Sequence, residues 1–195
     1  MNPDRAARAL LGPVATRLAH PFRRAHPVVL TIASGLLGIS GALLVALGEP
    51  LGAVVAVVGV CLDAIDGPVA RLTGRESRFG AWLDSTVDRA VDFALLAALG
   101  YRGHLDNDSA LIAAALAAAL ASFLASYARA RAEGIEVYTT EGIAPRWVRL
   151  CLTAVASLAL AAAAPTISTA ILLFIALLGI LTTISRGAAV AADER

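Results

Sequence analysis

The stretch DAIDGPVARLTGRESRFGAWLDSTVD, residues 63–88, places four aspartates inside an otherwise apolar chain. The chain has 195 residues, of which 58% are hydrophobic, and its mean hydropathy is +0.76. Such values are typical of membrane proteins rather than of soluble domains. An ionised aspartate inside a membrane helix costs about 2.5–3.5 kcal/mol on insertion scales, so four of them need compensation. The stretch therefore predicts a site that binds a positively charged partner.

Apolar segments on both sides of this stretch have the length needed to cross a bilayer, which is roughly 20 residues. Four of them carry few or no charges: 27–47, 109–128, 147–164 and 168–185. Two more segments carry the aspartates: 51–66 and 79–101. The sequence therefore predicts an all-α, polytopic membrane protein with six transmembrane helices.

The arginines predict how these helices are oriented. All 16 basic residues are arginines, and most of them cluster before the first segment, between the second and third, around the loop between the fourth and fifth, and after the sixth. The loops of the opposite side hold almost none, with Arg102 as the exception. By the positive-inside rule, both termini and the aspartate-rich loop are cytoplasmic, in a multi-pass protein of the cell membrane. Residues 4–20 are expected to form an amphipathic helix on the membrane surface.

We expect one domain over 1–195. It comprises a juxtamembrane helix in 1–24, a six-helix bundle in 25–188 and a cytoplasmic tail in 189–195.

Helical spacing brings the aspartates onto two faces. Residues i, i+3, i+4 and i+7 share one face of a helix, and so do residues that step by four. The first face comprises Asp63, Asp66, Gly67 and Ala70, and the second comprises Gly80, Asp84, Asp88 and Asp92. The short turn between them predicts that the two helices are antiparallel neighbours. Carboxylates without histidine or cysteine favour a hard cation, Mg²⁺ or Mn²⁺, over Zn²⁺.

The pattern D-x-x-D-G-x-x-A-R, eight residues, then G-x-x-x-D-x-x-x-D resembles the signature of the CDP-alcohol phosphotransferase (CDP-alcohol phosphatidyltransferase) family. It matches at Asp63, Asp66, Gly67, Ala70, Arg71, Gly80, Asp84 and Asp88. The resemblance implies a six-helix fold, a surface helix at the N-terminus, and a cytoplasmic active site. It also implies a homodimer that transfers a phosphatidyl group from CDP-diacylglycerol to a hydroxyl acceptor and releases CMP.

The resemblance also implies residue roles. Asp63, Asp66 and Asp84 would hold one Mg²⁺, and Asp63, Asp84 and Asp88 a second, with Mn²⁺ as an alternative. Asp88 would also be the general base. The residues that would bind the nucleotide or CDP-diacylglycerol are Val28, Val29, Thr31, Gly67, Ala70, Arg71 and Ser77. Of these, Val28 departs from the family, which has a polar residue at that position.

The stretch SYARARAEG, residues 126–134, resembles the phosphatidylinositol phosphate synthase branch of the family. A basic pocket for an acceptor phosphate would then comprise Arg129, Arg131, Arg146, Arg149 and Arg186. The acceptor implied is 1D-myo-inositol 3-phosphate; glycerol 3-phosphate or another alcohol is the alternative. Arginines at a membrane face also serve simply as topology anchors.

Two other classes use intramembrane carboxylates. A UbiA-like prenyltransferase carries its Asp-rich motifs on well-separated loops, whereas these four acids lie within 63–88. A transporter would need charges near the midplane of discontinuous helices. Both remain remote alternatives, and we expect no nucleic acid partner.

Overall fold

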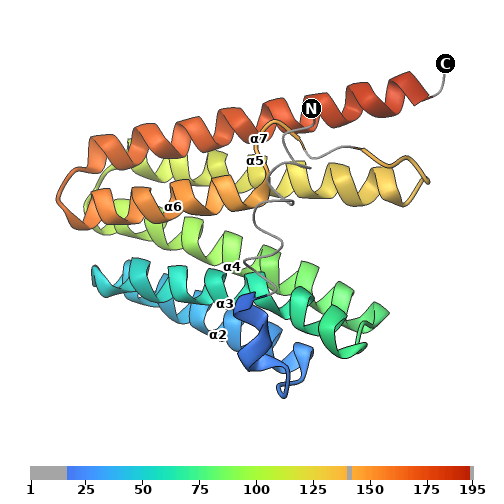
Figure 1. Ribbon diagram of the computed structural model, residues 1–195. Coiled ribbons are helices and arrows are strands. Elements are labelled where there is room, and N and C mark those ends of the chain that lie inside the picture. The colour runs from blue at the N-terminus through green and yellow to red at the C-terminus, as the bar shows by residue number, and fades with distance from the viewer. Residues whose placement is uncertain (1–16, 140–141, 194–195) are drawn as a thin grey trace.

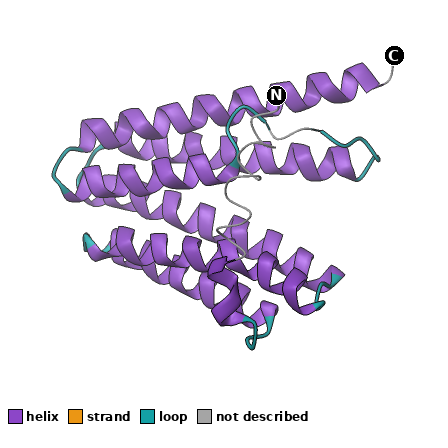
Figure 2. Ribbon diagram, in the orientation of Figure 1, coloured by secondary structure: helices purple, strands orange, loops and turns teal. Residues whose placement is uncertain are grey.

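The computed structural model describes residues 17–139 and 142–193. Figures 1 and 2 show helices joined by short connections, and no strand within these two ranges. A short 3₁₀ helix, η1 (His20–Phe22), precedes the bundle. The expected surface helix over 4–20 lies mostly outside the described residues.

Each of the six predicted segments falls in a long helix. The helices are α2 (Pro27–Ala46), α3 (Leu51–Thr73), α4 (Arg78–Leu105), α5 (Ser109–Glu133), α6 (Arg146–Ala161) and α7 (Pro165–Asp193). Four of them, α2, α3, α5 and α7, are long and apolar enough to cross a membrane. The aspartate-bearing α4 is too charged to qualify by composition, and α6 has 16 residues. That α4 and α6 also span the membrane therefore stays a prediction.

Two helices extend beyond the predicted apolar segments. α3 continues through Pro68 to Thr73, although proline cannot donate a backbone hydrogen bond and its ring crowds the preceding turn. α7 continues to Asp193, so the expected tail from residue 189 is largely helical.

α3 and α4 turn acids toward one space, as expected for antiparallel neighbours: oxygens of Asp63 and Asp66 on α3 and of Asp84 on α4 lie within 4.8 Å of one another. Within the described residues, α2 packs against both α3 and α4, while α3 and α4 are not among the closely packed pairs. α4 also packs on α5, and α7 packs on α5 and α6. α2 therefore lies against both of the helices that carry the aspartates.

Small residues allow the closest helix approaches, as expected for helices that pack within a membrane. A Cβ added to Gly41 would lie 2.6 Å from the backbone nitrogen of Ala56, and one added to Gly52 would lie 2.5 Å from that of Val45. These contacts hold α2 directly against α3. In the other half of the bundle, the fully buried side chains include Leu111 of α5 and Leu172 and Ile175 of α7.

Gly179→Ala is expected to destabilise the protein. A Cβ at this position of α7 would lie 2.8 Å from the Ala121 carbonyl carbon of α5, so the two helices must move apart. Overpacking of this kind costs roughly 1–3 kcal/mol. Thermal unfolding of the purified protein in detergent should show a lower midpoint. Gly187→Ala is the matched control in α7, because nothing lies within 4 Å of its added Cβ; an equal midpoint shift in both variants would contradict the prediction.

The connections define two ends of the bundle (Figure 1). The α2–α3, α4–α5 and α6–α7 turns lie together at one end. The α3–α4 turn, the residues that follow α5 and the end of α7 lie toward the other. Successive connections therefore alternate between the two ends, and the cytoplasmic placement of the second end stays a prediction.

Candidate active site

Three carboxylates meet between α3 and α4. Asp63 and Asp66 lie one turn apart on α3, and Asp84 lies near the start of α4. One oxygen from each lies within 4.8 Å of the others. Hard oxygen donors at this separation suit a divalent cation such as Mg²⁺ or Mn²⁺. The donor set therefore fits the metal that the sequence predicts.

Thr31 supports one of these ligands from α2. Its hydroxyl donates a hydrogen bond to Asp66 Oδ2 over 2.5 Å. Both side chains are buried, with Thr31 3% and Asp66 7% exposed. The resemblance implies that Thr31 contacts the nucleotide, which stays a prediction; in this structure its hydroxyl contacts Asp66 and the Pro27 carbonyl and so orients the Asp66 carboxylate.

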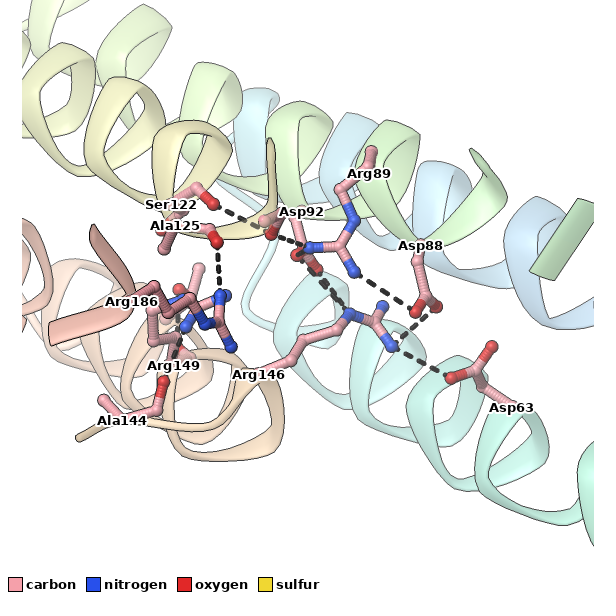
Figure 3. A network of polar contacts seen from close by, with 12 residues as sticks. Asp63, Asp88, Arg89, Asp92, Ser122, Ala125, Ala144, Arg146, Arg149 and Arg186 are labelled. Carbon is pink, nitrogen blue, oxygen red and sulfur yellow. Dashed lines mark hydrogen bonds and ion pairs between the residues drawn. The ribbon is translucent and has the colours of Figure 1, made fainter. Parts of the chain in front are cut away.

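Asp88 lies apart from this trio and contacts an arginine instead. Its Oδ1 lies 2.6 Å from Nη1 of Arg146, the first residue of α6. The same Nη1 donates to Asp63 Oδ2 over 3.1 Å. Nε of Arg146 donates to Asp92 on α4, at 3.2 Å from Oδ1 and 3.4 Å from Oδ2. Figure 3 shows this guanidinium between the three carboxylates.

Arg89 completes the network on α4. Its Nη2 donates to Asp88 Oδ2 over 3.5 Å, and its Nη1 lies 3.7 Å from Asp92 Oδ2. Its Nη1 also donates to the Ser126 hydroxyl of α5. Asp88 and Asp92 are thus each held between two guanidinium groups (Figure 3).

Asp63, Asp84 and Asp88 line a cavity of about 690 Å³. α3 and α4 contribute these three acids and one arginine to its wall, and α5, α6 and α7 contribute four arginines and one glutamate. The charged lining residues are Asp63, Asp84, Asp88, Arg89, Arg129, Glu133, Arg146, Arg149 and Arg186. One space is therefore lined by both anionic and cationic side chains.

Four of the five arginines predicted to bind an acceptor line this cavity, and Arg131 does not. Arg149 and Arg186 are buried, and their Nη1 groups donate to the carbonyls of Ala144 and Ala125, respectively. Nε of Arg149 is buried without a hydrogen-bond partner among the described residues. Backbone carbonyls therefore hold two guanidinium groups at the cavity wall, where an anion could meet them.

Residues 24–191 match the sequence family described as CDP-alcohol phosphatidyltransferase. The chain belongs to the CDP-alcohol phosphatidyltransferase family. The resemblance drawn from the spacing of the aspartates is confirmed.

Two curated relatives of this family match most of the chain. The phosphatidylinositol phosphate synthase of Streptomyces avermitilis is 35% identical over 157 residues, which covers 73% of this chain and 62% of that protein. The archaetidylinositol phosphate synthase of Methanothermobacter thermautotrophicus is 31% identical over 190 residues, covering 92% and 87%. Other curated relatives are longer: the match spans 17% of a bifunctional IPC transferase and DIPP synthase from Aquifex aeolicus.

The fold matches a solved member of the family. The crystal structure of Mycobacterium tuberculosis phosphatidylinositol phosphate synthase with CDP-DAG bound has a TM-score of 0.79 and 29% sequence identity, and the match covers 91% of this chain and 94% of that one. A second structure of that enzyme, in complex with manganese and citrate, also has a TM-score of 0.79 at 28% identity. Membership of a membrane-enzyme family and use of a divalent metal agree with the apolar helices and the carboxylate cluster.

The signature residues predicted to bind nucleotide flank the carboxylates. Arg71 is exposed at the end of α3, and its guanidinium covers Gly67, where an added Cβ would lie 3.4 Å from Nη1. Ser77 is the N-cap of α4, and its hydroxyl accepts a hydrogen bond from the Gly80 N–H over 3.0 Å. Ala70 is half-buried on the face of Gly67.

The other predicted nucleotide residues lie on the first turns of α2. Val28 is half-buried and Val29 is 58% exposed. Neither side chain carries a hydrogen-bonding group, so any contact that they make is through their backbone or apolar surface.

Sequence reasoning missed two charged residues of the site. Asp92 continues the spacing of four from Asp84 and Asp88 but lies outside the family signature, so no role was assigned to it. The sequence pattern predicted no role for Arg89. The repeated spacing of four was the available signal for Asp92, and nothing in the sequence linked it to Arg146, 54 residues away.

Proposed function

We propose that the chain catalyses metal-dependent transfer of a phosphatidyl group from CDP-diacylglycerol to the hydroxyl of a small phosphorylated alcohol. The observation that carries this proposal is the single cavity that joins the carboxylate cluster to Arg149 and Arg186. A diphosphate donor needs the carboxylates that hold its cations, and an anionic acceptor needs the arginines. The acceptor proposed is 1D-myo-inositol 3-phosphate; the relatives named as inositol phosphate lipid synthases support it.

Asp63, Asp66, Asp84 and Asp88 would hold up to two Mg²⁺ or Mn²⁺ ions. Bound there, the cations would neutralise the diphosphate and stabilise the charge on departing CMP. The ligand set would be completed by Asp88 only after Arg146 leaves its contacts with Asp63 and Asp88.

Other side chains would bind the two substrates and transfer the proton. Arg71 would place its guanidinium on phosphate oxygens of the donor. A carboxylate oxygen of Asp88 would take the proton from the acceptor hydroxyl. The acceptor oxygen then bonds to the phosphorus that carries diacylglycerol, and the bond from that phosphorus to the oxygen of CMP breaks. Arg129, Arg149 and Arg186 would hold the acceptor's own phosphate.

We further propose that the protein spans the cell membrane six times, with the cavity and both termini on the cytoplasmic side, and that it forms a homodimer. The arginine distribution supports the orientation. Exposed apolar side chains on the outer faces of the helices, such as Leu36, Leu120 and Phe174, are compatible with contact with lipid or a second copy.

The proposal is tested by measuring CMP release from CDP-diacylglycerol by the purified protein in detergent. Release should require both a divalent cation and an acceptor, and should stop when EDTA is added. Inositol phosphate, glycerol 3-phosphate and unphosphorylated inositol are compared at equal concentration. Faster release with glycerol 3-phosphate than with inositol phosphate would identify glycerol 3-phosphate as the better acceptor. No release with any alcohol tested would overturn the proposed activity.

Arg186→Ala is expected to raise the acceptor KM about 10- to 100-fold, because a charge-assisted contact with phosphate is worth roughly 1.5–3 kcal/mol. The donor KM should change much less, since Arg186 lies on α7, away from Arg71. Both substrates are titrated in the variant and in Arg102→Ala, which removes a guanidinium paired with Asp106 at the α4–α5 turn, at the opposite end of the bundle. An unchanged acceptor KM in Arg186→Ala would make this arginine a structural residue.

A further inference from the structure

One guanidinium, that of Arg146, uses its nitrogens on two different sets of carboxylates. Nη1 contacts Asp63 at 3.1 Å and Asp88 at 2.6 Å, and Nε contacts Asp92 at 3.2 Å. The side chain is 21% exposed and lines the main cavity. Nη1 therefore contacts Asp63 and Asp88, while Nε contacts Asp92.

The first set, Asp63 and Asp88, also has proposed roles in metal binding and catalysis. Asp63 belongs to the trio whose oxygens lie within 4.8 Å of one another, and Asp88 is the proposed base. A cation that binds these oxygens at the usual 2.0–2.6 Å cannot share them with a guanidinium of the same charge sign. Nη1 of Arg146 therefore competes with metal for Asp63 and Asp88.

The second set has no such competitor. Asp92 lies one turn beyond Asp88 on α4 and is outside the carboxylate trio. Both of its oxygens lie within hydrogen-bonding range of Nε of Arg146, and Arg89 Nη1 lies 3.7 Å away. The Nε contact can persist while Nη1 is displaced, because rotation about the last bonds of the side chain moves Nη1 further than Nε.

We propose that Asp92 is a positioning residue that holds Arg146 by Nε, while Nη1 exchanges between the metal-site carboxylates and an anion in the cavity. Without metal, Arg146 neutralises Asp63 and Asp88. Metal binding releases Nη1 toward the cavity lined by Arg129, Arg149 and Arg186. Metal and acceptor binding are thereby coupled, and by linkage each strengthens the other by the same factor. The coupling to an acceptor rests on the proposed function; the competition with metal does not.

The competition is measured as the Mn²⁺ affinity of the purified protein without nucleotide or acceptor, by electron paramagnetic resonance of free Mn²⁺. Arg146→Gln should bind Mn²⁺ about tenfold more tightly than the unaltered protein, because a charge-assisted competitor is gone. Arg129→Gln is the matched control: it removes the same charge from the same cavity, but Arg129 pairs with Glu133 at 2.8 Å. Its Mn²⁺ affinity should stay within about twofold, as expected for an exposed pair.

The role of Asp92 is tested by a double-mutant cycle. Asp92→Asn should weaken Mn²⁺ binding several-fold, because Arg146 then has only Asp63 and Asp88 as ionised partners. In the Arg146→Gln background the same substitution should change the affinity by less than about twofold. Equal weakening in both backgrounds would show that Asp92 acts only through its charge or on the fold, and would overturn its positioning role.

The outcomes separate this inference from the proposed function. If the unaltered protein binds Mn²⁺ and Arg146→Gln binds it no more tightly than Arg129→Gln, the inference is wrong and the metal site stands. If neither the unaltered protein nor Arg146→Gln binds Mn²⁺, both fail. In the supporting case, adding inositol phosphate should tighten Mn²⁺ binding in the unaltered protein and do so less in Arg146→Gln.

Discussion

Asp88→Asn is expected to lower the rate of CMP release by about 100- to 10,000-fold, because a general base contributes 10²–10⁴-fold and asparagine cannot accept the proton. The substitution keeps the size of the side chain. It removes one of the three carboxylates around Arg146, at 2.6 Å from Nη1, while the Asp63 and Asp92 contacts stay. The fold should therefore survive, and thermal unfolding should show it.

The matched control is Asp106→Asn at the other end of α4, where the carboxylate is exposed and pairs with Arg102. Its rate should equal that of the unaltered protein. Binding of CDP-diacylglycerol is measured beside turnover, since Asp88→Asn should retain it. If Asp88→Asn turns over within tenfold of the control, Asp88 is not the base.

Asp66→Ala is expected to abolish metal-dependent binding of CDP-diacylglycerol, and turnover with it. It removes one of the three carboxylates whose oxygens gather within 4.8 Å, so the cation loses a direct ligand. The loss of affinity should exceed the 10- to 100-fold that follows from changing residues around a metal's ligands. CDP-diacylglycerol affinity with and without Mg²⁺ is the measurement, and Asp63→Ala should behave alike.

Glu133→Ala is the control for Asp66→Ala and Asp63→Ala, because Glu133 lines the same cavity but pairs with Arg129 on α5. Its metal dependence should be unchanged. Asp66→Asn controls for the buried hydrogen bond from Thr31, since the amide oxygen can still accept it. If Asp66→Ala and Asp63→Ala depend on metal as the unaltered protein does, the metal site lies elsewhere.

The sequence predicted the helices and the carboxylate site because both follow from local spacing. Apolar runs of membrane-spanning length identify helices, and steps of three and four residues put acids on one face. Asp63, Asp66 and Asp84 were thus expected together, and they meet.

Contacts between distant segments followed no such rule. Nothing local indicated that Arg146 would contact Asp92, or that Thr31 would donate a hydrogen bond to Asp66. The short turn between α3 and α4 predicted antiparallel neighbours whose acids face one space, and their carboxylates do meet there. The packing of α2 against both helices could not be read from the sequence pattern.

The tight seam between α2 and α3 ties distant positions to the chemistry. Gly41 and Gly52 leave no room for a single added carbon, and the same two helices carry Thr31 and Asp66. A larger residue in the seam must push α2 from α3 and so shift the Thr31–Asp66 contact. In a genetic screen for lost lipid synthesis, substitutions at these glycines would therefore have the same phenotype as substitutions of the proposed metal ligands, although glycine has no reactive side chain.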